Sequence, residues 1–390
     1  MRAYVWTDNS LTRHAGRFVW LSLDFEKAKN APARRRLRIS AFPTLYVVDP
    51  ADSSVAIRWL GGASLAQLER LFDDGELAVN GGARGPALEA LVAADRAYGV
   101  ERFAEATVRY RRALALAPED WPAYGRTVES CLFAYSQADS AEASLRLADA
   151  AWPRLRGGSS AAIVASLALD AAVELPDSVP GRSDWLTRYE GACHEVLHED
   201  AGSLLADDRS GVFFSLEAAR EAVGDSAGLL VLRERHLAML EAEADRAPDP
   251  EKRAVYDSHR LSLYLALGRP EKAIPMLEQS RRDFPDDYNP PQRLATAYKA
   301  MQRWPEALAA STAARQRAYG PRQFLVFNTR ADIQLGMADT TAARQTLLAA
   351  LALAEKMPEG LRSANTIRDL KARLEKLGVK PPAPKAAVGR

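Results

Sequence analysis

The pattern of apolar and polar positions changes near residue 80, and the two parts of the chain predict different structure. Before residue 80, short runs of β-branched and aromatic residues alternate with helical stretches. Three strands are predicted, at 18–23, 44–48 and 54–59, followed by a helix at 64–72. Residues 80–86 are rich in glycine and predict a linker.

After residue 86 the apolar spacing is helical almost throughout, and small residues recur within it at a period close to 34 residues. The first set is Ala106, Tyr110, Ala113 and Pro118. The same pattern returns at Ala141, Leu145, Ala148 and Pro153; at Ala273, Leu277, Ser280 and Pro285; at Ala307, Ser311 and Ala314; and at Ala343, Leu347 and Ala350. Small residues are needed where two antiparallel helices approach closely, and a proline stops the second helix. Each set therefore predicts one helical hairpin.

This spacing resembles the tetratricopeptide repeat over about residues 87–155 and 254–356, which implies a mostly α fold of the α-solenoid type. Four further helices are predicted between 156 and 250, where the repeat pattern fits poorly. The expected domains are a small α/β segment at 1–78, a helical repeat domain at 86–380, and a disordered, proline-rich tail at 381–390.

The segment before residue 80 resembles the later part of a thioredoxin-like domain. Residues 39–45 match the substrate-side loop of that family, so the resemblance implies that Phe42, Pro43 and Thr44 form this loop and that Pro43 is cis. A thioredoxin-like redox site also needs two cysteines in a C-x-x-C pair. The two cysteines here, Cys131 and Cys193, form no such pair, so the resemblance is incomplete.

In the order of that family, the C-x-x-C and the central strand would lie upstream of Met1. Without that strand, the strands at 18–23 and 44–48 would both have open edges. We therefore expect that the chain begins at an internal methionine of a longer protein. The arrangement resembles bacterial thioredoxin-family proteins with a tetratricopeptide tail, which implies export or a periplasmic location for the longer protein. As written, with no signal peptide and no apolar run of ~18 residues, the chain is expected in the cytoplasm.

The first helices of a tetratricopeptide array line a concave groove, and carrying this over by position predicts a peptide-binding groove. Its residues are Ser258, Asn289, Gln292, Thr296, Lys299, Asn328 and Asp332. Polar residues of this kind suit an extended peptide that is held through its backbone and termini. A solvated helix face explains the same residues. The net charge of +1 gives no reason to expect nucleic acid or an anionic membrane as a partner.

Residues 194–198 form an H-E-x-x-H motif, in which His194 and His198 on one helix face could bind zinc with Glu195 as general base. Glu217 is the candidate third ligand. The alanine-rich helices around the motif, and the lack of a predicted sheet beside it, favour the alternative of a solvated helix face.

The sequence as a whole favours a non-enzymatic scaffold that binds a protein or peptide segment and needs no cofactor. Two enzymatic alternatives stay open. One is a thiol-disulfide oxidoreductase that is completed by an upstream C-x-x-C, with the repeats recruiting substrates. The other is a zinc hydrolase at 194–198.

Overall fold

The computed structural model describes residues 5–37, 39, 42–80, 85–158, 160–198 and 204–379. The chain divides into two compact units. The first comprises Met1–Ala15 and Arg38–Leu240, and the second comprises Gly16–Leu37 and Glu241–Arg390. The predicted division at 78–86 follows the change in composition, whereas the compact units separate at Leu240 and place a segment from the start of the chain in the second unit.

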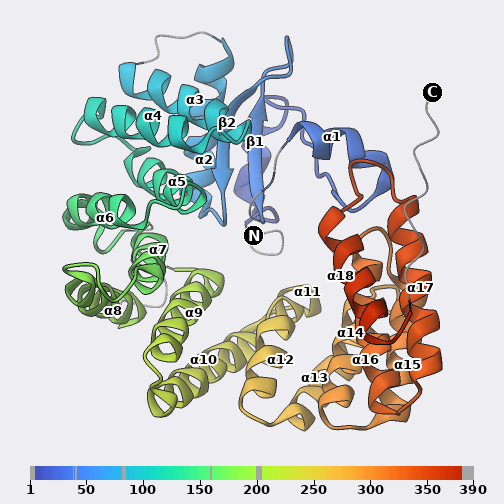
Figure 1. Cartoon of the computed structure of the whole chain (residues 1–390). Coiled ribbons are helices and arrows are strands. Elements are labelled where there is room, and N and C mark those ends of the chain that lie inside the picture. Colours follow the sequence, from blue (N-terminus) through green and yellow to red (C-terminus); the bar gives the residue numbers. More distant parts are fainter. Residues whose placement is uncertain are drawn as a thin grey trace. The chain divides into compact units, whose positions relative to one another are not determined.

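The first unit combines one β-hairpin with a series of helices. Its elements are η1 (Asn9–His14), β1 (Thr44–Val48), β2 (Val55–Leu60), α2 (Leu65–Asn80), α3 (Pro86–Gly99), α4 (Phe103–Leu116), α5 (Tyr124–Gln137), α6 (Ala141–Leu155), α7 (Ala161–Glu174), α8 (Arg182–His198), α9 (Ala206–Ala222) and the first part of α10 (Ser226–Arg246). The strands pair in antiparallel fashion, with Thr44 opposite Leu60 and Val47 opposite Ile57. Strand β2 contacts α2, α3 and α5, and Figure 1 shows α2 and α3 beside the hairpin.

The second unit is helical in the described residues. Its elements are η2 (Ala28–Asn30), α1 (Ala31–Arg36), the end of α10, α11 (Pro250–Ala254), α12 (Asp257–Ala266), η3 (Pro270–Lys272), α13 (Ala273–Asp283), α14 (Asn289–Ala300), α15 (Trp304–Arg317), α16 (Arg322–Gly336), α17 (Thr340–Lys356) and α18 (Ala364–Lys376). From α12 to α18 each helix packs on the next (Figure 1). Among the first helices of successive pairs, α14 also contacts α12 on one side and α16 on the other, so the three form one face. Among the described helices, none has the length and apolar composition of a membrane span.

The repeat pattern predicted from the sequence is confirmed by burial. Its small and large apolar positions are at most 1% exposed in every predicted hairpin, with Ala141 the partly exposed exception. Pro118 and Pro285 follow the ends of α4 and α13, as expected. Pro153 does not end its helix, since it lies inside α6 two residues before the last one. Pro153 removes one helical hydrogen bond, and because only two residues of α6 follow it, little of the helix depends on the missing bond.

The strand predicted at 18–23 is wrong. These residues belong to the second unit, form no strand, and leave apolar side chains in solvent, with Val19 87% exposed. Among the described residues the sheet contains β1 and β2 alone. An apolar, β-branched run favours an extended backbone, but a strand forms only where a neighbouring strand supplies hydrogen-bond partners.

The segment Gly16–Leu37 packs on the later repeats of the second unit. The Tyr319 hydroxyl donates a hydrogen bond to Asp24 Oδ2 over 2.7 Å, and Ala31 lies in the hydrophobic core of α16, α17 and α18. Gly320 has a φ of +52°, and a Cβ at this position would lie 2.1 Å from the Glu26 carbonyl oxygen. Only glycine permits this backbone conformation together with so close an approach.

Five side chains, named the Asp95 cluster, hold β2 against the first repeat helices. The cluster comprises Arg58, Asp95, Tyr98, Tyr110 and Arg126. Asp95 Oδ1 accepts a hydrogen bond from the Tyr110 hydroxyl over 2.6 Å. Asp95 Oδ2 accepts from the Arg58 backbone N–H over 3.1 Å and from Arg126 Nη1 over 3.3 Å. The Arg58 guanidinium lies 3.2 Å from the centre of the Tyr98 ring. The cluster therefore joins the α/β segment and the first repeats into one unit.

Candidate functional site

The predicted groove residues lie on the first helices of the second unit, and three of them are linked by side-chain contacts. Lys299 Nζ on α14 lies 3.0 Å from Asp332 Oδ2 on α16. Arg373 on α18 donates to Asn328 Oδ1 over 2.8 Å and also binds Asp332. These four half-buried side chains, Lys299, Asn328, Asp332 and Arg373, are named the charged ladder. They span three helices, so the repeat packing fixes their spacing.

The other predicted groove residues are placed differently. Gln292 is buried between α14 and α16, where its Nε2 donates to Thr329 Oγ1 over 2.7 Å. Thr296 donates to the Gln292 carbonyl, and Asn289 bonds to Asp287 in the turn before its helix. Ser258 on α12 is exposed. Gln292 is thus a packing residue, whereas the charged ladder supplies partly exposed polar side chains on these helices.

Arg373 was not predicted from the sequence, although a signal for its position is present. Ile367, Leu370 and Leu374 have helical spacing and pack into the core of the last repeats. This spacing fixes which face of α18 is buried and leaves Arg373 beside that face, toward α16. What the spacing does not show is that Arg373 meets Asn328 and Asp332.

The loop predicted to face a substrate contains a cis peptide bond between Phe42 and Pro43, as the resemblance implied. Phe42 is exposed, and Thr44 begins β1; positions 38, 40 and 41 lie outside the described residues. Both cysteines are buried. Burial raises the pKa of Cys131 to about 12 and that of Cys193 well above its ordinary value. Neither thiol is therefore a ready nucleophile at neutral pH.

The H-E-x-x-H residues lie on α8, but Glu217 does not join them. Glu195 forms an ion pair with Arg156, and burial lowers the pKa of His194. Glu217 on α9 contacts residues of α10 instead. Within the described part of the chain, no three His, Cys, Asp or Glu side chains are grouped to hold a metal ion.

Glu217 belongs to a buried set of hydrogen-bonded side chains that was not predicted from the sequence. His236 Nδ1 lies 2.9 Å from Glu217 Oε1, and His236 Nε2 lies 3.0 Å from Ser210 Oγ. The His236 ring stacks on Phe213, with ring centres 4.8 Å apart. Serine, histidine and an acid in this order also make catalytic triads, but Ser210 is 1% exposed and out of reach of a substrate. These hydrogen bonds and the ring stacking therefore pack α9 on α10.

No protein-family model and no curated protein matches the chain. Among solved structures it is similar to the TPR2AB domains of yeast Sti1 in a complex with pHSP90, with 17% identity, a TM-score of 0.29, and coverage of 75% of this chain and 98% of that one. It is also similar to yeast Tom70, with 12% identity, a TM-score of 0.16, and coverage of 80% and 94%. TM-scores below 0.5 do not establish a shared fold. The tetratricopeptide architecture of this chain rests on its own helix pairs and on the burial of its repeat positions.

Proposed function

We propose that this chain is a scaffold that binds an extended protein or peptide segment on the first-helix face of its second unit. The charged ladder is the observation that supports this proposal most directly. Its side chains are held by one another yet stay partly exposed, so they lose little conformational freedom when a ligand binds. A face that offers both donors and acceptors suits a peptide, whose backbone presents both.

Asn328 is the ladder residue best placed to contact a peptide backbone. Arg373 donates to its Oδ1, which orients the amide. Within the described residues, no hydrogen bond uses the Asn328 amide nitrogen. A peptide carbonyl can accept from this nitrogen without displacing an existing contact, and the fixed orientation lowers the cost of forming that bond.

Replacing Asn328 with alanine is expected to weaken peptide binding about tenfold, the value of one hydrogen bond of ~1.4 kcal/mol. The probe is a peptide selected from a random display library on the full chain, and its affinity is measured by fluorescence anisotropy. Gln345→Ala, at an exposed position of the second helix α17, is the matched control and should keep the original affinity. Equal affinities of the two variants, or a failure to select any saturable binder, would contradict the proposal.

We further infer that residues 42–80 are a remnant of a thioredoxin-like fold with a structural role. The order of β1, β2 and α2 agrees with that resemblance, and the Asp95 cluster fastens β2 to the repeats. Because both thiols are buried, the chain is expected to show no thiol-disulfide exchange in an insulin-reduction assay. Activity that disappears in a Cys131→Ser or Cys193→Ser variant would show this inference to be wrong.

A further inference from the structure

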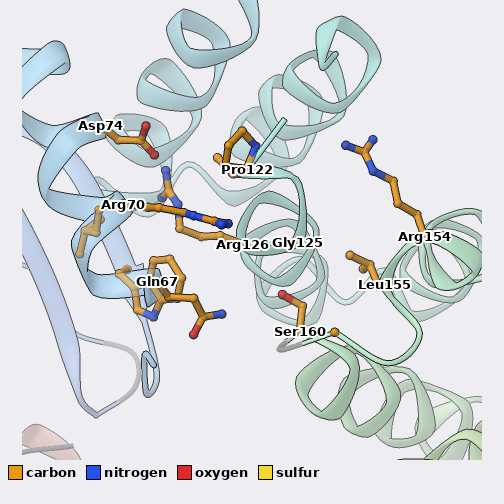
Figure 2. A pocket seen from close by; sticks show the side chains of 13 residues that line it. Gln67, Arg70, Asp74, Pro122, Gly125, Arg126, Arg154, Leu155 and Ser160 are labelled. Carbon is orange, nitrogen blue, oxygen red and sulfur yellow. The ribbon is translucent and has the colours of Figure 1, made fainter. Parts of the chain in front are cut away.

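A cavity of about 160 Å³ opens in the first unit between α2, the start of α5 and the loop after α6 (Figure 2). It is large enough for several water molecules or a small organic molecule. Three guanidinium groups line it, those of Arg70, Arg126 and Arg154, against the single lining carboxylate of Asp74. The lining is therefore positively charged.

Buried charge behind the cavity wall has the same sign. Arg58 is 1% exposed and Arg126 is 5% exposed. The Arg126 guanidinium pairs with the buried Asp95 carboxylate, which also accepts a hydrogen bond from the Arg58 backbone N–H. Arg126 Nη2 is buried and has no hydrogen-bond partner among the described residues. Burying a donor of a charged group without a hydrogen-bond partner is costly, so Arg126 Nη2 needs an acceptor at this wall of the cavity.

Arg70 supplies a second guanidinium on the opposite wall. It is exposed, and no hydrogen bond or ion pair within the described residues holds it. Figure 2 shows Arg70 and Arg126 extending toward one another from α2 and α5. Arg154 is fixed at the rim, where its Nη2 donates to the Pro118 carbonyl over 3.2 Å and its guanidinium covers the Tyr124 ring. The Asp74 carboxylate attracts both Arg70 and Arg126. One carboxylate does not balance two cations, so a further anion between them would reduce the remaining repulsion.

Apolar groups complete the lining. Trp59, Leu71, Pro122 and Leu155 border the same cavity. They can cover the carbon atoms of a ligand whose charged end faces the guanidinium groups. A guanidinium offers paired donors in a planar fork, which matches the oxygens of a carboxylate or a phosphate.

We propose that this cavity binds a small molecule with a carboxylate or phosphate group, and that Arg70 and Arg126 hold this oxyanion between them. The site lies wholly in the first unit and is independent of the peptide groove. It gives the chain a small-molecule ligand in addition to the proposed protein or peptide partner.

The test is a calorimetric titration of the full chain with inorganic phosphate and, separately, with succinate, at constant ionic strength. Saturable one-to-one binding is expected for at least one probe, and the tighter probe identifies the preferred group. Arg70→Gln should weaken binding about tenfold or more through the loss of a charge-assisted contact. Because Arg70 is exposed, this variant is expected to fold normally.

Two further variants make the result specific. Arg112→Gln removes an exposed arginine of α4 that does not line the cavity, and it should leave the affinity unchanged. Asp74→Asn removes the lining carboxylate and should tighten binding severalfold, because a like charge no longer faces the ligand. The absence of saturable binding for both probes would overturn the proposal. So would equal weakening in Arg70→Gln and Arg112→Gln, which would mean general attraction of anions to the surface.

Discussion

Replacing Asp95 with alanine is expected to lower the free energy of unfolding of the first unit by roughly 3–5 kcal/mol. Asp95 is fully buried, and its Oδ2 accepts hydrogen bonds from the Arg126 guanidinium and from the Arg58 backbone N–H. Its loss leaves the buried Arg126 guanidinium without its ion-pair partner, and it removes the acceptor of the Arg58 backbone N–H and of the Tyr110 hydroxyl. Removing one partner of a buried ion pair destabilises a protein far more than the intact pair stabilises it. The remaining charge is still buried away from water but no longer has an opposite charge beside it.

Urea unfolding of the full chain measures this effect. Chains with two compact units need not unfold in one step, so the transition that shifts is the informative one. Asp120→Ala, at an exposed position between α4 and α5, is the control and should change the midpoint little. Tyr110→Phe removes one hydroxyl from the same cluster and should cost about 1 kcal/mol. A loss below that value in Asp95→Ala would mean that the cluster does not hold β2 to the helices.

Replacing Glu129 with glutamine is expected to stabilise the first unit, and increasingly so as the pH rises from about 4.5 to about 8. Glu129 on α5 is 3% exposed, and its Oε1 has no partner among the described residues. Burial raises the pKa of Glu129 to about 8, although the Ser160 hydroxyl and Arg126 oppose this rise. The folded state therefore keeps a proton that the unfolded chain, with a carboxyl pKa near 4.5, releases.

The sign follows from which state binds more protons. Below pH 4.5 both states are protonated at Glu129, and its titration has no effect on stability. Between pH 4.5 and pH 8 only the folded state is protonated, so stability falls as pH rises, by on the order of 5 kcal/mol over this interval. Glutamine has nearly the same shape and no charge to bury, so the variant escapes this loss.

Thermal and urea unfolding at pH 5 and pH 8 check the prediction. The stability of Glu129→Gln should exceed that of the parent chain by more at pH 8 than at pH 5. Glu119→Gln, at an exposed position, is the matched control and should show no such difference between the two pH values. If the advantage of Glu129→Gln does not change with pH, then the Glu129 carboxyl is ionised in the folded protein and the prediction fails.

The candidate groove was only partly accessible to sequence reasoning. The resemblance to the tetratricopeptide repeat predicted that Lys299, Asn328 and Asp332 lie on the face of the first helices. In the structure these three are linked through contacts with Arg373 and one another. The same reasoning placed Gln292 on the open face, yet it is buried against Thr329. Positions one turn apart on a helix differ by a small rotation, and the packing of the neighbouring helix decides which of them stays open.

The sequence by itself determined the helical hairpins, because each depends on contacts between residues that are close along the chain. A period near 34 residues, with small residues where helices cross, specified positions such as Ala106, Leu277 and Ala343, and all three are fully buried. Only the tertiary structure decided which distant segments share a unit. Asp24 meets Tyr319, and Arg58 shares Asp95 with Arg126, although neither set has a spacing that predicts contact. Such contacts depend on the fit of side chains from separate elements, and a periodic pattern describes one element at a time.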